Sequence, residues 1–442
     1  MRRVWIGAAI YAVVMTLLGI DRYVTYHSGA DLGEFVQTIS TAFGQFGDTA
    51  EGGSHYLHHF SPLLYLAAPP LLALRSPVVL IALQAIAGAL TAPAIYLIAR
   101  KRTNETIAVL AGITALLYPP LVGVTFTDFH ENGFAPAAIA WLIWAVDNRK
   151  WWPAAGLVLV ALGIKEDEAL AIAAVATMYA VASARRGDKT GVRFGAAAIV
   201  VALAVFAAYF GLVRPAAGAH DRWFALDYFT GHDFDTPHGA AIVVGRLTFL
   251  LEAFVPLLFI PLRTQWFFFA VPGLVEVLSS RWSITYTMGQ HYAGVWIAYV
   301  LAAYAVGLAA IARSRPERAL LLARIAIGIC VLNLAAASPT HWGHYLRARN
   351  AHDAALDRLV AQVPPAAAVA TYDEVYSHLG FDPNAQIGFS PQDVPEYALF
   401  DERYDGGAWL KIYRPRLQQL IAQGRYAPVA IEDGATLYRR TK

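Results

Sequence analysis

Long apolar runs separated by short charged turns dominate this sequence, and they restrict it to one class of fold. Of its 442 residues, 57% are hydrophobic and 15% are charged, whereas a soluble globular protein carries about 25% charged residues. A helix needs about 20 mostly apolar residues to cross a bilayer. We therefore predict a polytopic α-helical membrane protein. The candidate spans are residues 4–20, 78–99, 106–124, 134–147, 151–164, 167–184, 193–213, 246–262, 264–280, 291–312 and 318–336.

The basic residues between these runs predict how often the chain crosses the membrane. Arg and Lys are enriched in cytoplasmic loops. The run 61–75 is ambiguous because its prolines remove backbone donors that a spanning helix needs. All basic loops fall on one side only if this run lies on the outer surface. We therefore predict about 11 spans, with the N-terminus in the cytoplasm and the C-terminus outside. The basic loops are Arg2-Arg3, Arg100 to Arg102, Arg149-Lys150, Arg185 to Lys189, Arg263 and Arg313 to Arg318.

The remaining composition narrows the compartment and the partners. The first run follows basic residues as in a signal peptide, but Gly19-Ile20-Asp21 is a poor cleavage site, so we predict a retained span in the cytoplasmic (inner) membrane. The net charge is +2 and the basic residues are scattered, which gives no indication of a nucleic-acid partner. Cys330 is the one cysteine, so the chain forms no internal disulfide.

The last hundred residues differ in pattern from the rest. We predict a transmembrane module over 1–336, with a first outer loop at 21–77, and an extracytoplasmic α/β domain over 337–442. Asp433-Gly434 predicts a hairpin turn. The expected strands are Ala366–Tyr372, Tyr397–Asp401, Pro428–Ile431 and Thr436–Tyr438, and the expected helix is Leu410–Gln423.

Acidic and histidine residues gather in the predicted outer loops. Ionisable groups at the mouth of an apolar bundle are costly to retain, so they indicate a site. The first outer loop holds Asp31, Glu34 and His59, and two later turns read Asp128-Phe129-His130-Glu131 and Lys165-Glu166-Asp167.

These residues together resemble the bacterial and archaeal multi-pass proteins of domain of unknown function 2079. The two most specific motifs are the pair Asp-Leu-Gly and His-Phe-Ser-Pro, and the Asp-Phe-His-Glu turn. The resemblance covers nearly the whole chain and rests on Arg22-Tyr23, Gly29 to Phe35, His59 to Pro62, Gln84, Tyr118-Pro119, Asp128 to Glu131, Lys165 to Asp167, His291-Tyr292 and the tail domain.

That family is similar to the GT-C class of glycosyltransferases, which are multi-spanning enzymes that use polyprenyl-phosphate sugars. They keep an acidic residue in the first outer loop, followed by surface helices, and many carry an outer soluble domain. The resemblance implies a polyprenyl-phosphate-linked sugar donor and an acceptor glycan, lipid or protein in the cell envelope. The activity is an analogy at the level of the fold.

An inverting glycosyl transfer needs a carboxylate that takes a proton from the acceptor hydroxyl. Asp31 is our candidate base, Glu34 lies one helical turn further on, and Asp128 is a third candidate catalytic residue. The alternative for Asp31 and Glu34 is a capping box at a helix N-terminus.

A phosphate leaving group needs positive charge. Lys165, Arg22, Arg222 and Arg281 are the candidates on the outer side. The alternative for Lys165 is a structural ion pair inside the bundle, and Arg22 could be an interfacial anchor.

The remaining candidates contact substrate. His59, His130, Glu131, Glu166, His291 and Tyr292 could bind sugar, phosphate or the lipid carrier. Asp128 and His130 could hold a divalent cation such as Mg²⁺ or Mn²⁺, although their spacing matches no zinc signature. The loop 214–245, with His220, Asp221, His232, Asp233, Asp235 and His238, is a weaker metal candidate or an ordinary solvated loop.

Two other function classes compete with the enzyme. A transporter or flippase would show ionisable residues near mid-membrane and two related halves, and we find neither pattern in the sequence. A non-catalytic scaffold that presents the tail domain would not need clustered outer carboxylates.

Overall fold

The computed structural model describes residues 1–231, 238–336, 342–389, 394–404, 406 and 409–441. It divides into two compact units, which are described separately. The first contains Met1–Thr16, Tyr56–Leu64 and Ala82–Trp342, and the second contains Leu17–His55, Tyr65–Ile81 and Gly343–Lys442. This division by packing assigns part of the first outer loop to the second unit. The predicted boundary between functional domains at residues 336 and 337 stays a prediction.

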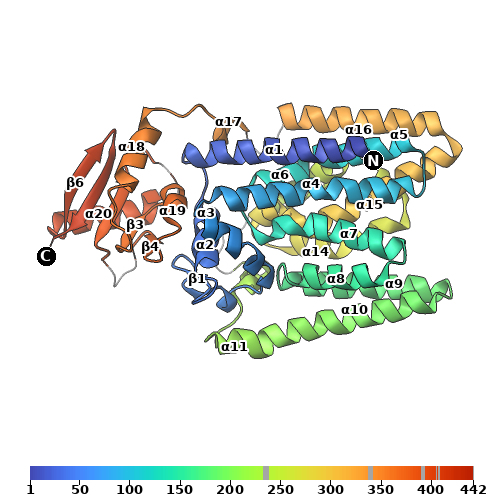
Figure 1. Ribbon diagram of the computed structural model, residues 1–442, viewed down its shortest axis with the longest axis horizontal. Coiled ribbons are helices and arrows are strands. Elements are labelled where there is room, and N and C mark those ends of the chain that lie inside the picture. Colours follow the sequence, from blue (N-terminus) through green and yellow to red (C-terminus); the bar gives the residue numbers. More distant parts are fainter. Residues whose placement is uncertain (232–237, 337–341, 390–393, 405, 407–408, 442) are drawn as a thin grey trace. The chain divides into compact units, whose positions relative to one another are not determined.

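Long apolar helices form the first unit (Figure 1). Six helices of the described chain are long and apolar enough to cross a bilayer. They are Arg2–Val24 (α1), Val78–Arg100 (α4), Asp167–Arg185 (α9), Lys189–Ala216, His291–Ser314 and Pro316–Ala336 (α16). The span Lys189–Ala216 consists of α10, Lys189–Ala208, and the helical turns that continue it. The span His291–Ser314 consists of α15, Gly294–Ser314, and the turn before it.

A bent pair of helices is long and apolar enough for a seventh span when the two helices are taken together. Glu105–Leu117 (α5) and Pro119–Phe126 (α6) meet at an angle of 44°. Pro119 and Pro120 cause this break, because proline disfavours helical backbone in the preceding residue and lacks the N–H that a continuing helix needs. The predicted span 106–124 is therefore broken at Tyr118.

The other four predicted spans are shorter helices. They are Ala135–Asp147 (α7), Trp151–Leu162 (α8), Ala240–Phe254 (α13) and Val271–Ser279 (α14), which follows a 3₁₀ segment at Gln265–Ala270. The structure thus confirms a bundle of six to seven apolar helices, and the count of 11 spans is not confirmed. The ambiguous run 61–75 forms a 3₁₀ segment, Pro62–Leu66, and the short helix α3, Ala68–Leu74, each too short to span.

Helix α15 is the packing core of the first unit. It contacts α5, α7, α14 and α16, and Trp296 and Tyr304 on it are fully buried. Helix α16 instead exposes large apolar side chains such as Leu321 and Leu332. An apolar exterior around a packed interior is what a lipid solvent requires.

The second unit carries a five-stranded mixed sheet with the order β4-β3-β5-β7-β6. The strands are Val369–Thr371 (β3), Ala385–Ile387 (β4), Tyr397–Asp401 (β5), Tyr426–Glu432 (β6) and Ala435–Arg440 (β7). Strands β4 and β5 pair with β3 in parallel, and β7 pairs antiparallel with β5 and β6.

The predicted elements of this unit largely match. The hairpin is confirmed: Asp433 and Gly434 have φ values of 45° and 92°, as a type I′ turn requires. The predicted helix 410–423 is found as a π-helical turn, Trp409–Tyr413, and α20, Arg414–Ala422. The predicted strand 366–372 is shorter than expected, and β4 and the helices Ala351–Val360 (α18) and Asp373–Leu379 (α19) were not predicted.

Helix α2, Ala30–Ser40, packs within the second unit against α19. A Cβ atom on Gly33 would lie 2.5 Å from the ring of Tyr376, so only glycine allows this approach. Gln37 fixes the contact, because its Nε2 donates to the carbonyl of Asp382 at 2.6 Å and its Oε1 accepts from the Tyr376 hydroxyl at 2.7 Å. Residues from the start and the end of the chain thus form one packed body.

Candidate functional site

A buried group of opposite charges lies in the first unit, where three turns of the chain meet. Lys165 Nζ lies 3.3 Å from Glu131 Oε1, and His130 Nδ1 lies 3.0 Å from Glu131 Oε2. Glu131 is fully buried, and Lys165 is 6% exposed. We call this group, with His59, Glu166 and His291, the Glu131 cluster.

His59 and Glu166 form the second ion pair of the cluster. His59 Nδ1 lies 2.9 Å from Glu166 Oε1, and the backbone N–H of Phe60 donates to Glu166 Oε2 at 2.8 Å. The segment around His59 is held by two further bonds, from Arg214 Nε to the carbonyl of Leu57 and from Trp223 Nε1 to that of His58. The structure therefore places the His-Phe-Ser-Pro motif beside the Lys-Glu-Asp turn, as expected if both motifs belong to one site.

Gln84 on α4 positions the turn that carries His130 and Glu131. Its Oε1 accepts the backbone N–H of His130 at 2.9 Å, and its Nε2 donates to the carbonyls of Thr125 and Thr127. A Cβ atom on Gly133 would approach Gln84 Oε1 to 2.8 Å, so the turn needs glycine there. Gln84 therefore holds the backbone between α6 and α7 at three residues, Thr125, Thr127 and His130.

The charges of the cluster stabilise one another. Burial by itself would raise the pKa of Glu131, but the neighbouring His130 and Lys165 outweigh it and hold that pKa well below its usual range. Burial would lower the pKa of Lys165, and the carboxylates of Glu131, Asp167 and Glu166 instead raise it. The pKa of Glu166 is lowered, because His59 and Lys165 overcome the effect of burial. Lys165 and both glutamates are therefore charged at neutral pH.

His130 is kept neutral beside these charges. Burial and the charge of Lys165 lower its pKa to about 4, although Glu131 acts in the opposite direction. Its ring stacks on that of His291 at 3.5 Å between centroids, with an angle of 10° between the planes. The His291 ring also contacts Tyr292 at 4.1 Å. The predicted residues His130, Glu131, Lys165, Glu166, His59, His291 and Tyr292 thus lie in one region of the first unit.

Other predicted residues lie outside this core. Asp128 is half-buried, and its backbone carbonyl accepts from Gln84. Arg222 is exposed and forms an ion pair with Asp227. Arg281 is exposed, and its Nη1 donates to the carbonyl of Thr230 at 3.0 Å. No observation tests the substrate roles of these residues, which stay predictions.

The second unit holds a different group, the acidic cluster, made of Asp31, Glu34, Asp48, Glu51 and Asp373. Burial and the charges of the other four carboxylates raise the pKa of Glu34 well above its usual value. Helix α2 has Gly29 as its N-cap, with no side-chain cap hydrogen bond. The capping-box alternative for Asp31 and Glu34 is therefore wrong, because both lie inside the helix.

Arg22 also belongs to the second unit. Its Nε donates to the carbonyl of His27 at 2.8 Å, and its guanidinium lies 4.3 Å from the centre of the Tyr345 ring. It is 7% exposed. Its role toward phosphate stays a prediction.

Sequence reasoning missed several members of both groups. Asp48 and Glu51 of the acidic cluster come from one glycine-rich turn, and Asp373 comes from the start of α19. Glu168 is fully buried on the first turn of α9 beside the Lys-Glu-Asp turn. The sequence did offer a signal for Glu168, because a carboxylate within an apolar, membrane-spanning helix is rare and indicates a functional residue.

A metal ion was a further expectation for Asp128 and His130. Within the described ranges, no group of three or more His, Cys, Asp and Glu side chains has the geometry to hold a metal ion. His232, Asp233 and Asp235 of the weaker metal candidate lie outside those ranges. The cation proposed for Asp128 and His130 stays a prediction.

Comparison with known proteins bears out the predicted resemblance. The chain has the fold of ArnT from Cupriavidus metallidurans bound to undecaprenyl phosphate, with a TM-score of 0.66, 12% identity and 98% of each chain covered. The apo state of the same protein gives a TM-score of 0.63 at 12% identity, over 98% of this chain and 97% of that one. This likeness supports the GT-C-like fold, and no curated protein matches the chain.

A family model described as "Predicted membrane protein (DUF2079)" matches residues 22–437, which is nearly the whole chain. The protein therefore belongs to the DUF2079 family of multi-pass membrane proteins.

Proposed function

We propose that this protein is a membrane glycosyltransferase that moves a sugar from a polyprenyl-phosphate donor to an acceptor outside the cytoplasmic membrane. The observation that carries the proposal is the Glu131 cluster, in which a buried, permanently charged lysine is held by carboxylates within a GT-C-like bundle. A neighbour of the same fold is bound to undecaprenyl phosphate, which makes a lipid phosphate the natural donor class to test.

The reaction requires a cation at the leaving oxygen. The acceptor hydroxyl attacks the anomeric carbon, the bond from that carbon to the phosphate oxygen breaks, and the lipid phosphate leaves with the electron pair. Lys165 can stabilise the charge that develops there, because an ammonium has three N–H donors and Glu131 engages one side of it. His59 and His130 add hydrogen-bonding nitrogens in the same region.

The acceptor proton requires a carboxylate, and we assign this role to Asp31. Asp31 lies in the first turn of α2, two residues after the N-cap Gly29. The raised pKa of Glu34 means that this neighbour keeps its proton where an ordinary carboxyl has lost it. Carboxyls with perturbed pKa values occur more often at functional sites than elsewhere.

The arrangement of basic turns supports the proposed orientation. Arg102 forms two hydrogen bonds to Asp147 at the end of α7, and Arg149 pairs with Asp188 in the α9–α10 turn. Three basic turns are thus neighbours at one end of the bundle, as the prediction of a common cytoplasmic side expects. The Glu131 cluster joins the turns at the other ends of α7, α8 and α9.

The deciding experiment measures transfer by the purified protein with a panel of polyprenyl-phosphate sugars, beside an Asp31→Asn variant. Loss of a general base lowers turnover by about 10²–10⁴-fold, while donor binding should remain. Glu396→Gln is the control, since it removes an exposed carboxylate of the same unit and should leave turnover unchanged. Well-folded protein that binds none of the lipid-phosphate sugars would contradict the proposal and favour a transporter or scaffold.

A further inference from the structure

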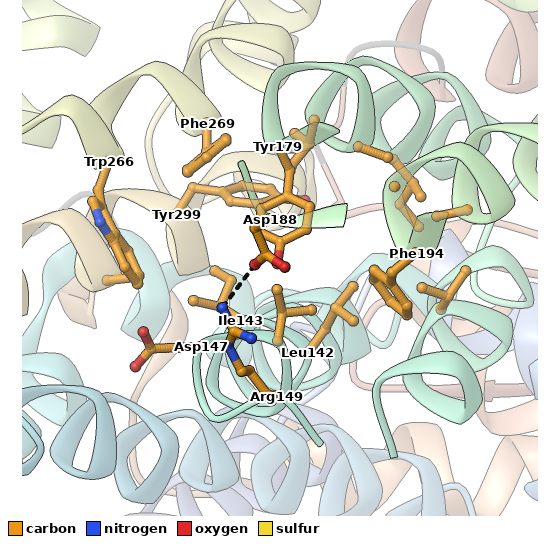
Figure 2. A pocket seen from close by; sticks show the side chains of 18 of the residues that line it. Leu142, Ile143, Asp147, Arg149, Tyr179, Asp188, Phe194, Trp266, Phe269 and Tyr299 are labelled. Carbon is orange, nitrogen blue, oxygen red and sulfur yellow. Dashed lines mark hydrogen bonds and ion pairs between the residues drawn. The ribbon is translucent and has the colours of Figure 1, made fainter. Parts of the chain in front are cut away.

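A cavity lies at the end of the first unit that carries the basic turns (Figure 2). Its volume is about 390 Å³. Apolar side chains of α7, α9 and α10 form the walls, and charged side chains gather at one end. Because Ile172 and Arg186 both line it, the cavity follows α9 for about 20 Å at 1.5 Å per residue. None of its lining residues belongs to the Glu131 cluster.

The charged end of this cavity has more cations than carboxylates. Arg102, Arg149 and Arg186 line it together with Asp147 and Asp188. Asp147 accepts two hydrogen bonds from Arg102, and Asp188 accepts one from Arg149 at 2.9 Å. Arg186 contacts the hydroxyl of Ser183 at 3.5 Å and, among the described residues, no carboxylate. Donors are therefore left for an anion.

The backbone at Arg149 is held in an unfavourable conformation. Its φ is 55°, in the left-handed region, although its side chain carries a Cβ. Glycine or asparagine is the ordinary choice for this conformation after a helix such as α7, because a Cβ atom disfavours it. The conformation places an arginine at the mouth of the cavity, paired with the turn before α10.

An amphiphile matches both ends of this cavity. Arginine forms paired hydrogen bonds with phosphate oxygens, and an apolar chain lowers its free energy by leaving water for the walls of Leu142, Ile143 and Val175. An inorganic anion would use only the charged end, and an uncharged chain would leave the guanidiniums without an added partner.

We propose that this cavity binds a membrane lipid, with its phosphate headgroup at Arg149 and Arg186 and one apolar chain along α9. The shared chemistry is a phosphate headgroup of net negative charge joined to a long hydrocarbon chain, from either an anionic bilayer phospholipid or a polyprenyl phosphate. The site is separate from the proposed donor site, and the inference does not depend on glycosyl transfer.

The test titrates delipidated protein in detergent with four probes: phosphatidylglycerol, undecaprenyl phosphate, phosphatidylcholine and inorganic phosphate. Binding is measured by native mass spectrometry and by the rise in melting temperature that a ligand of the native state produces. The wild type should bind phosphatidylglycerol or undecaprenyl phosphate at least tenfold more tightly than the other two probes. The tighter of the two lipids identifies the source.

The discriminating variant is Arg149→Gly, with Arg149→Asn as its partner. Both relieve the left-handed backbone, so the ligand-free protein should keep its melting temperature, yet affinity for the lipid should fall about tenfold. Arg313→Ala is the matched control, because Arg313 sits in another basic turn and does not line the cavity. Unchanged affinity in Arg149→Gly, equal binding of phosphatidylcholine, or binding of inorganic phosphate alone would overturn the proposal.

Discussion

The two charged clusters show how differently the same residue behaves in two parts of one chain. Glu131 and Glu34 are both glutamates whose pKa burial would raise. In the first unit, Lys165 and His130 reverse that effect, and the pKa of Glu131 falls well below its usual range. In the second unit, Asp31, Asp48, Glu51 and Asp373 add to it, and the pKa of Glu34 rises. Burial raises the pKa of both glutamates, so the sign of the neighbouring charges accounts for the difference between them.

This difference has consequences for function and stability. The Glu131 cluster combines the cation of Lys165 with carboxylates that it stabilises, so removing Lys165 leaves the carboxylate of Glu131 buried without its cation. The acidic cluster is unbalanced and retains a proton instead. The Glu131 cluster is suited to holding a fixed positive charge at Lys165, and the acidic cluster is suited to accepting or donating a proton.

The largest expected effect comes from breaking the balance of the Glu131 cluster. Lys165→Met should lower the free energy of unfolding by about 3–5 kcal/mol, because it leaves the buried charge of Glu131 without its cation. A fall in the melting temperature of the detergent-solubilised protein measures the loss.

The matched control for Lys165→Met is Glu396→Gln. The pair Arg439–Glu396 has the same N···O distance of 3.3 Å, but both side chains are more than a third exposed. Breaking such a surface pair should cost about 1 kcal/mol or less. The double variant Glu131→Gln/Lys165→Met should recover much of the stability lost in Lys165→Met. Equal losses in the buried and exposed pairs would contradict the comparison.

A smaller effect is expected from the pH dependence of the neutral histidine. The folded pKa of His130 is lowered to about 4, so its contribution is fully present above the unfolded pKa of about 6.5 and is lost as pH falls toward 4. Wild-type stability should therefore decrease by about 2 kcal/mol between pH 6.5 and pH 5. Melting temperatures of the wild type and His130→Gln between pH 7.5 and 5 measure this slope.

The slope should shrink in His130→Gln without vanishing. His378 in the second unit has a pKa lowered to about 4 by burial, and it adds a similar dependence. A slope that is the same in the variant and the wild type would show that His130 is already charged in the folded state.

The smallest effect is expected in the acidic cluster and has the opposite sign. A carboxyl with a raised folded pKa contributes stability below its unfolded pKa and loses it as pH rises. Glu34→Gln should therefore match the wild type near pH 4 and exceed its stability by about 1 kcal/mol at pH 8. Paired melting curves at these two pH values test the expectation, and a variant that is destabilised equally at both would contradict it.

Local patterns in the sequence predicted several elements well. The apolar runs became the helices of the bundle, and Asp433-Gly434 became a hairpin turn, because hydropathy and turn chemistry are properties of short segments. The span lengths were less predictable. Pro119 and Pro120 broke one run, and 61–75 and 264–280 formed several short helices, since packing decides where such segments bend.

The site was predictable in its residues and not in its pairings. His59, His130, Glu131, Lys165 and Glu166 stood out as polar groups in apolar surroundings. That His59 would meet Glu166, 107 positions away, could not be derived from spacing. The packing of Gln37 against Tyr376, 339 positions apart, had no local signal. The approach of Asp373 to Asp31 and Glu34 likewise could not be derived from spacing.

The sequence by itself determined that this is a multi-pass membrane protein with a sheet-bearing tail and polar turns between its helices. Composition and periodicity suffice for this, because each span or strand must satisfy its own surroundings. Only the tertiary structure decided which carboxylate faces a cation and which faces other carboxylates. Electrostatic energy depends on distances of a few ångströms between residues far apart in the chain, and only folding sets those distances.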